Sequence, residues 1–257
     1  MNKIKEKIPS QSSFWLSPNY NTNLNFINFA NFKEEKMTNE KIYKLENYQN
    51  SNMNPGNLQR LPDESFVFID AGFLSKLNKY FGEGLYLKYD IIKLADRLCE
   101  KQRLICKKVY YYTAPPFQST MPSKEEEIRK KNYDKFVKQL LKNKNIMIRE
   151  GRCQRLKIDN LYEFSQKAVD SLAIIDLMEV PLDHPQIKKI VLVACDSDFV
   201  PVIKKLEEKG IKTILYTYYQ KSRDENFSTS NQLIKCVWKY VILTKVDFDS
   251  CPLDKMK

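Results

Sequence analysis

Three aspartates that close apolar runs are the residues of this 257-residue chain best suited to chemistry. Asp70 closes the run 66–69, and Asp196 and Asp198 close the run that begins at 190. If both runs are buried parallel strands, these carboxylates lie outside the carboxyl ends, where open parallel sheets bind their ligands. Ionised carboxylates there are costly unless a cation shares the site, and carboxylate oxygens suit a hard divalent ion. The pattern therefore indicates a site for Mg²⁺ or Mn²⁺.

Each of these aspartates also has a simpler interpretation. Asp198 could cap the helix that is predicted to begin at Phe199, because aspartate is favoured at helix N-termini. Asp70 and Asp196 could be ordinary turn residues at strand ends. The spacing alone leaves both interpretations open.

A fourth aspartate, Asp170, stands in the first turn of an apolar helix predicted over 169–178. Asp176 follows six positions later, about 240° around that helix, so the two side chains do not share a face. Only one of them can point at the carboxyl edge of the sheet, and the spacing favours Asp170. Asp176 is kept as an accessory candidate. Lys167 could face a phosphate oxygen or pair with the acids.

The elements that would position these acids alternate between strands and helices. Apolar runs predict strands at about 66–69, 106–112, 146–148, 190–194 and 211–216, and helical spacing predicts helices at about 74–81, 91–98, 123–143, 169–178 and 199–208. Segment 189–219 is a strand–helix–strand crossover of the right-handed kind. Residues 230–243 suggest one more helix and a last strand. The alternation predicts a three-layer α/β domain over 61–257, with a mostly parallel sheet of about five strands.

The first 60 residues differ from the rest. They contain 13 asparagines and no aspartate, and they show no sustained helical or strand periodicity. Such a segment buries too little apolar area to offset the entropy of ordering it. We therefore expect residues 1–60 to be a disordered, asparagine-rich tail.

The composition excludes several classes of protein. The formal net charge is +11, and no apolar run is long enough to span a membrane. The polar N-terminus lacks the apolar core of a secretory signal, and the six cysteines are scattered without a CxxC pair, so we expect a cytoplasmic protein without a structural zinc site. The single histidine, His184, leaves Cys195 without a second histidine to activate it. No phosphate-binding glycine motif occurs.

A basic segment indicates a nucleic-acid surface. Residues 124–155 contain eleven Lys or Arg and five acids, and such a surface can neutralise phosphates. The alternative is a solvated helix face with Glu–Lys pairs. Tyrosines at 110–112, 216, 218 and 219 could stack on unpaired bases, although packing is an equally ordinary role for strand tyrosines. The candidate nucleic-acid-binding residues, for RNA or DNA alike on charge alone, are Arg129, Lys130, Lys131, Lys135 and Lys138.

Three segments together resemble the NYN domain, which belongs to the PIN-like group of metal-dependent ribonucleases. They are 66–74, 167–170 and 190–201, and Asp-Ser-Asp-Phe-Val-Pro at 196–201 is the most specific part. The resemblance covers about residues 65–243. It implies a Rossmann-like sheet, an acidic Mg²⁺ or Mn²⁺ pocket and hydrolysis of RNA phosphodiester bonds. Carried over by position, the family's acidic set falls on Asp70, Asp170, Asp196 and Asp198, with Asp176 matching a further aspartate of that helix.

The chain departs from the family pattern at several positions. Ala71 and Phe73 stand where the family usually has Gly and Asn, and Ala168 replaces the Gly of its Lys-Gly-Val-Asp element. The leading hypothesis is a metal-dependent endoribonuclease. The alternative is an RNA-binding or regulatory module with the same fold and little or no activity. A receiver-type phosphoacceptor is a third possibility, disfavoured because Tyr216-Thr217 occupy the place of its lysine.

Overall fold

A computed structural model describes residues 61–158, 161–220, 227 and 230–253. The chain divides into two compact units, Met1–Gln59 and Arg60–Lys257, and the description below concerns the second. The tail predicted over 1–60 lies outside the described residues. Within the described ranges, no helix is both long enough and apolar enough to cross a membrane.

The core of the domain is one parallel sheet. Its six strands run in the order β3-β2-β1-β6-β7-β8 and every neighbouring pair is parallel, which confirms the predicted α/β class. Six strands replace the predicted five or so, because the short last strand forms. The bounds are β1 (Asp63–Asp70), β2 (Leu104–Thr113), β3 (Ile146–Glu150), β6 (Lys189–Val193), β7 (Lys212–Thr217) and β8 (Lys239–Ile242).

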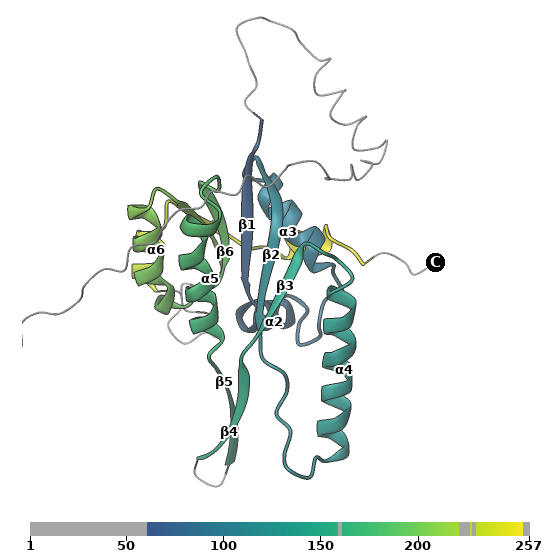
Figure 1. Ribbon diagram of the computed structural model, residues 1–257. Coiled ribbons are helices and arrows are strands. Elements are labelled where there is room, and N and C mark those ends of the chain that lie inside the picture. Colours follow the sequence, from purple (N-terminus) through teal and green to yellow (C-terminus); the bar gives the residue numbers. More distant parts are fainter. Residues whose placement is uncertain (1–60, 159–160, 221–226, 228–229, 254–257) are drawn as a thin grey trace, which may run out of the picture. The chain divides into compact units, whose positions relative to one another are not determined.

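Helices cover both faces of this sheet, which makes three layers (Figure 1). In β1, Val67 and Ile69 pack with one core cluster, whereas Phe66 and Phe68 pack with the other. This alternation explains the continuous apolar run, because both faces of the strand are buried. The helices are α2 (Ala71–Phe81), α3 (Ile91–Glu100), α4 (Lys124–Leu140), α5 (Val169–Asp183), α6 (Val200–Glu208), α7 (Asn231–Cys236) and α8 (Lys245–Asp249), with a short 3₁₀ turn, η1 (Ser197–Phe199).

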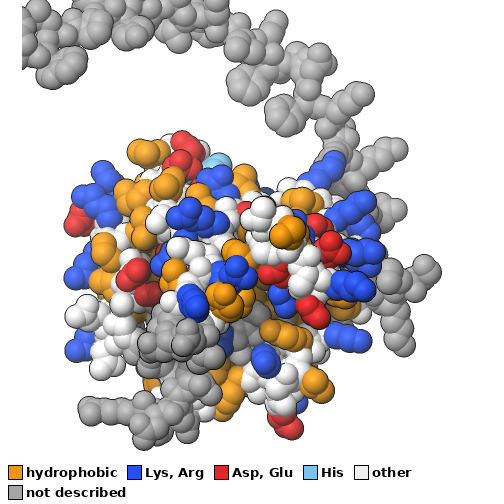
Figure 2. All heavy atoms as spheres, turned by 90° about the horizontal axis from the view of Figure 1, so that it is seen from below, with side chains coloured by type: hydrophobic (Ala, Val, Ile, Leu, Met, Phe, Trp, Pro, Cys, Tyr) orange, Lys and Arg blue, Asp and Glu red, His pale blue; other side chains and the backbone are white. Residues whose placement is uncertain are grey.

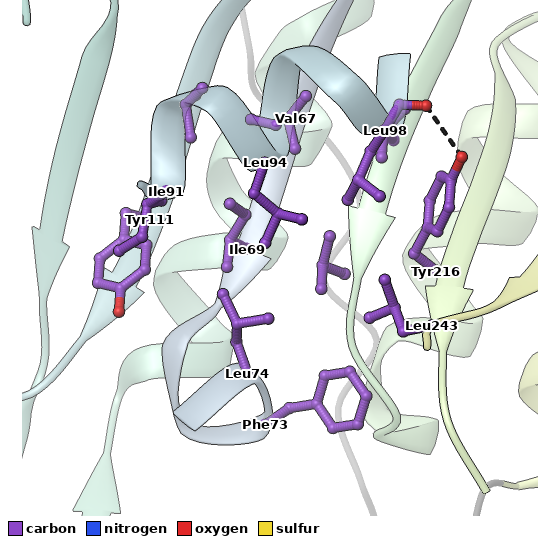
Figure 3. Packing of buried hydrophobic residues seen from close by; sticks show 14 of the residues in the cluster. Val67, Ile69, Phe73, Leu74, Ile91, Leu94, Leu98, Tyr111, Tyr216 and Leu243 are labelled. Carbon is purple, nitrogen blue, oxygen red and sulfur yellow. Dashed lines mark hydrogen bonds between the residues drawn. The ribbon is translucent and has the colours of Figure 1, made fainter. Parts of the chain in front are cut away.

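The first cluster lies between the sheet and α2, α3 and α8 (Figure 3). The hydroxyl of Tyr216 donates to the carbonyl of Leu98 at 2.9 Å, which ties β7 to α3. Phe73 is buried in the same cluster, 4% exposed. The position where the NYN pattern usually has Asn therefore contributes to the core here.

The helix α4 begins as predicted but packs loosely. Ser123 and Glu126 form the predicted capping box, and the helix ends at Leu140 rather than near Asn143. Its apolar stripe is only partly covered, since Phe136 is 39% and Leu141 is 55% exposed. Most of this helix therefore faces solvent.

An antiparallel hairpin was not predicted. Its strands β4 (Arg152–Ile158) and β5 (Leu161–Lys167) form a separate two-stranded sheet between β3 and α5. Figure 1 shows this hairpin and the start of α4 extending past α2, beyond the carboxyl ends of the parallel strands. The hairpin and the start of α4 thus lie on either side of the sheet edge at which the sequence predicts Asp70 and Asp196.

Strand order places a crevice at this edge. β1 and β6 are neighbours, with Ile69 opposite Val193. After β1 the chain turns to α2 and its core cluster, whereas after β6 it continues to α6 and the opposite cluster. Divergent connections of this kind create the switch-point crevice in which open α/β sheets bind ligands.

Candidate active site

Asp70 is held at the end of β1 by the start of α2. One carboxylate oxygen, Oδ1, accepts hydrogen bonds from the backbone N–H groups of Gly72 at 2.8 Å and Phe73 at 3.2 Å. Asp70 is thus the N-cap of α2, as its turn interpretation allowed. Neither bond uses Oδ2, so capping and binding of a ligand by this side chain are compatible.

Asp196 and Asp198 lie in the turn after β6. The Oδ1 atom of Asp196 accepts from the backbone N–H of Asp198 at 3.0 Å and caps η1. The interpretation of Asp198 as a helix cap is therefore wrong, since α6 begins at Val200 behind Phe199. Both aspartates are exposed, so their carboxylates can be reached from solvent.

Asp170 lies in the first turn of α5 and is partly buried. The residue that precedes the helix, Ala168, has a φ of 67°, in the left-handed region that favours glycine. This explains why the NYN pattern has Gly at that position. In this chain, the turn that precedes Asp170 contains an alanine in a strained backbone conformation.

The charges of the aspartates at this edge affect one another, as the pKa shifts of Asp70 and Asp170 indicate. Burial raises the pKa of Asp70 to about 6; its two backbone hydrogen bonds oppose the rise, and the charges of Asp170 and Asp196 add to it. Burial also raises the pKa of Asp170, followed by the charges of Asp196 and Asp198. These four carboxylates therefore repel one another across the crevice, and a cation would relieve the repulsion.

Asp176 is not part of this group. It is 3% exposed, its carboxylate accepts from Tyr112 Oη at 2.9 Å and from Arg149 Nε at 2.8 Å, and Arg149 Nη2 donates as well. The side chain of Asp176 therefore faces the sheet and contacts β2 and β3. Asp176 thus has a structural ion pair, and Asp170 is the aspartate of α5 that lies near the edge.

The four aspartates fit a divalent cation in the chemistry of their donor atoms. Within the described ranges, however, no three Asp, Glu, His or Cys side chains converge closely enough to hold a metal ion. Partly buried Asp70 and Asp170 would supply fixed oxygens, and exposed Asp196 and Asp198 would have to turn toward the ion. Oxygen-only donors of this kind suit Mg²⁺ or Mn²⁺.

A groove of about 1280 Å³ opens beside Asp70 and runs to α4. At its inner end, Asp70 Oδ1 and Gln166 Oε1 lie 3.2 and 3.4 Å from where a side chain at Gly72 would begin. Figure 2 looks onto this edge of the domain and shows Lys and Arg side chains around it. The cations that line the groove are Lys76, Lys88, Lys93, Lys135 and Lys142.

The basic residues predicted on α4 divide between two places. Lys135 lines the groove and also a second, shallower pocket of about 510 Å³, which Lys130, Lys131 and Lys138 share. Lys130 pairs with Asp134, as the alternative of a solvated helix face expected. Arg129 is exposed, and so is Lys167 at the end of β5.

Sequence reasoning missed two polar residues near the acids, Lys76 and Gln166. The charge of Lys76 lowers the pKa of Cys195, although burial and the nearby carboxylates together raise it to about 11. A thiol of that kind is a poor nucleophile at neutral pH, which agrees with the exclusion of Cys195. Neither Lys76 nor Gln166 belongs to a motif, so only the fold could reveal them.

Packing decides the role of most of the other predicted aromatic residues and of the histidine. Tyrosines 110–112 and Tyr216 are buried, so they cannot stack on bases, whereas Tyr218 and Tyr219 are partly exposed and their stacking stays a prediction. The His184 ring packs edge-on against Phe66 at 4.7 Å, four residues before Asp70 in β1.

Comparison with known proteins identifies the family of this chain. A solved protein of unknown function from Vibrio parahaemolyticus RIMD 2210633 is similar at 13% identity and a TM-score of 0.48, over 75% of this chain and 99% of its own. No curated protein matches the chain. The sequence profile of the NYN domain matches residues 65–243, which include the four clustered aspartates. This chain therefore belongs to the NYN domain family.

Proposed function

We propose that this protein is a metal-dependent endoribonuclease that hydrolyses RNA phosphodiester bonds. The observation that carries the proposal is the group of mutually repelling carboxylates Asp70, Asp170, Asp196 and Asp198, together with a lysine-lined groove whose wall includes Ala71 and Gly72, directly after Asp70. NYN domains are generally nucleases, and an acidic crevice beside a basic groove suits metal-assisted hydrolysis of a bound polyanion. A bound Mg²⁺ or Mn²⁺ would polarise the phosphate and lower the pKa of an attacking water.

The chain's own residues would position this chemistry. The N-terminus of α2 fixes one oxygen of Asp70, so the direction of the other oxygen is set before a ligand arrives. Asp196 and Asp198 come from the neighbouring strand end and can close on the ion from solvent. Lys76 lies on the groove side of the same edge, where it can neutralise a phosphate that approaches the acids.

The groove gives RNA a path to the acids. Lysines line it from Lys76 to Lys142, and each phosphate that they neutralise would release a counterion and make binding salt-dependent. The second candidate function is an RNA-binding module of the same fold without activity. It is favoured by the apolar placement of Phe73 and by the strained turn at Ala168, which change the surroundings of the acids.

One experiment separates the two functions. The full-length protein is incubated with labelled single-stranded RNA in Mn²⁺, in Mg²⁺ or in EDTA, beside Asp70→Asn. Asp249→Asn is the matched control, because Asp249 is an exposed aspartate of α8. The nuclease proposal expects metal-dependent cleavage by wild type and control only. RNA binding without cleavage by all three proteins would favour the binding module.

A further inference from the structure

The hairpin has two chemically different faces. Directly opposed residues of an antiparallel pair point to the same side, and the register pairs Arg155 with Phe164 and Lys157 with Tyr162. One face therefore carries both aromatic residues, and the other carries the acidic Glu163. We call the first the aromatic face; its described residues are Cys153, Arg155, Lys157, Tyr162, Phe164 and Gln166.

The aromatic rings of this face are exposed yet held in place. Tyr162 is 57% and Phe164 is 56% exposed. The guanidinium of Arg155 lies 4.6 Å from the centre of the Tyr162 ring and 4.7 Å from that of Phe117. The Phe117 and Phe164 rings are 5.8 Å apart. Rings supported in this way can receive a flat partner without first losing conformational freedom.

The aromatic face is continuous with the candidate active site. Gln166 belongs to it and also lines the groove beside Asp70. Phe164 and Tyr162 lie two and four residues farther along the same strand, which corresponds to about 7 and 13 Å. A chain whose backbone crosses the acids can therefore continue directly over both rings.

The charge of this face selects the kind of partner. None of its six residues is acidic, and Arg155 and Lys157 are both exposed cations beside the rings. Alternating cations and exposed rings match a polyanion with flat, unpaired bases, because every base has a π-face and every nucleotide a phosphate. Bases within a duplex present no free face to a side chain.

We propose that the aromatic face stacks unpaired bases of an RNA strand that crosses the acidic crevice. The proposal rests on the proposed function and adds the residues outside the acidic crevice that recognise the bases. Tyr162 and Phe164 act as stacking residues. Arg155 holds the Tyr162 and Phe117 rings in place and neutralises a phosphate of the RNA backbone.

The test compares bases with backbone in a double-mutant cycle. Binding of a fluorescent single-stranded RNA of about 16 nucleotides is measured by anisotropy in EDTA, together with a strand of equal charge that contains a run of abasic nucleotides. We expect the double variant Tyr162→Ala/Phe164→Ala to bind the normal strand about 10-fold more weakly or worse. The affinity of wild type should fall by a similar factor when the abasic strand replaces the normal strand. The affinity of the double variant should be nearly the same for the two strands. Tyr240→Ala is the matched control, since Tyr240 is an exposed tyrosine (44%) on β8.

Each contrary result has a separate meaning. Equal binding of both strands by wild type, or no change in the variant, overturns the stacking proposal while metal-dependent cleavage can still be seen. Absence of cleavage by wild type overturns the proposed function, whatever the binding shows. A wild-type dimer that the variant converts to a monomer in sedimentation would assign the face to self-association and also overturn the proposal. If the double variant melts early, Phe164→Ala alone gives the same cycle with a smaller expected loss.

Discussion

The helix α5 carries two aspartates with opposite relations to the protein. Asp170, in its first turn, is partly buried, and burial together with the charges of Asp196 and Asp198 raises its pKa. Asp176, six residues later, is buried beside Arg149 and Tyr112, which satisfy its charge. A paired buried charge serves the fold, whereas like charges held together at a strand end cost stability and persist at sites that bind a cation or substrate. The contrast separates a structural acid from the acid that we propose to be functional on a single helix.

The largest effect should come from neutralising the edge aspartate. We expect Asp170→Asn to lower RNA cleavage in Mn²⁺ by about 100-fold or more, because a metal ligand provides several kcal/mol of transition-state stabilisation. Asp176→Asn is the matched variant on the same helix, and it should retain cleavage when assayed well below its melting temperature. Initial rates on labelled RNA measure both. Equal losses in the two variants would contradict the division.

Breaking the interior pair should reduce stability instead. Arg149→Met leaves Asp176 buried with Tyr112 as its remaining side-chain partner among the interactions described. We expect a loss of about 2–4 kcal/mol, or about 5–15 °C in melting temperature, because an uncompensated carboxylate stays inside. Lys205→Met removes an exposed ion pair, Lys205–Glu208, and should change stability by about 0.5 kcal/mol or less. Similar melting curves for the two variants would argue against a structural role for Asp176.

Removing the charge of Asp70 should raise stability, whereas removing Arg149 lowers it. The folded protein holds the pKa of Asp70 at about 6, above its ordinary value of 3.8. As pH rises from about 4 to 6, the unfolded chain loses this proton first, so folding becomes less favourable and the full cost remains above pH 6. Asn keeps the cap of α2 without the charge. We expect Asp70→Asn to raise stability by about 1–2 kcal/mol at pH 7.

Two measurements check that prediction about Asp70. Thermal melts at pH 7 and at about pH 3 should show the gain at pH 7 and its near disappearance at about pH 3, where the side chain is mostly protonated in both states. Millimolar Mn²⁺ should raise the melting temperature of wild type but not of the variant. A gain that persists in full at about pH 3 would mean that it does not come from the carboxylate charge.

The sequence was sufficient for the parallel sheet and for where its acids stand. Strands buried on both faces are continuous apolar runs, so the ends of β1 and β6, and with them Asp70 and Asp196, could be located. The 240° step along α5 also separated Asp170 from Asp176. Nothing local indicated Arg149 as the partner of Asp176, because that contact joins residues 27 positions apart.

The hairpin and the groove could not be predicted in the same way. In residues 152–167 the aromatic side chains share a face with cations and remain exposed. The alternation of apolar and polar residues that marks a half-buried strand is therefore absent. The pair Asp159-Asn160 was the one turn signal between the two strands. The groove is lined by residues from 71 to 253, which only the tertiary fold brings together.

The smallest effect concerns the residue that aims the edge aspartate. Ala168 has a left-handed φ of 67° and an exposed side chain, so Gly would relieve strain without loss of packing. Relief of about 1–2 kcal/mol, less the greater entropy of Gly in the unfolded chain, leaves an expected gain of about 0.5–1 kcal/mol for Ala168→Gly. Ala173→Gly, at a buried helical position of the same α5, should lose about 1 kcal/mol or more. Urea melts measure both changes. If the two substitutions shift the midpoint in the same direction, the backbone before Asp170 is not strained, and the departure from the family's Gly has no energetic consequence at the start of α5.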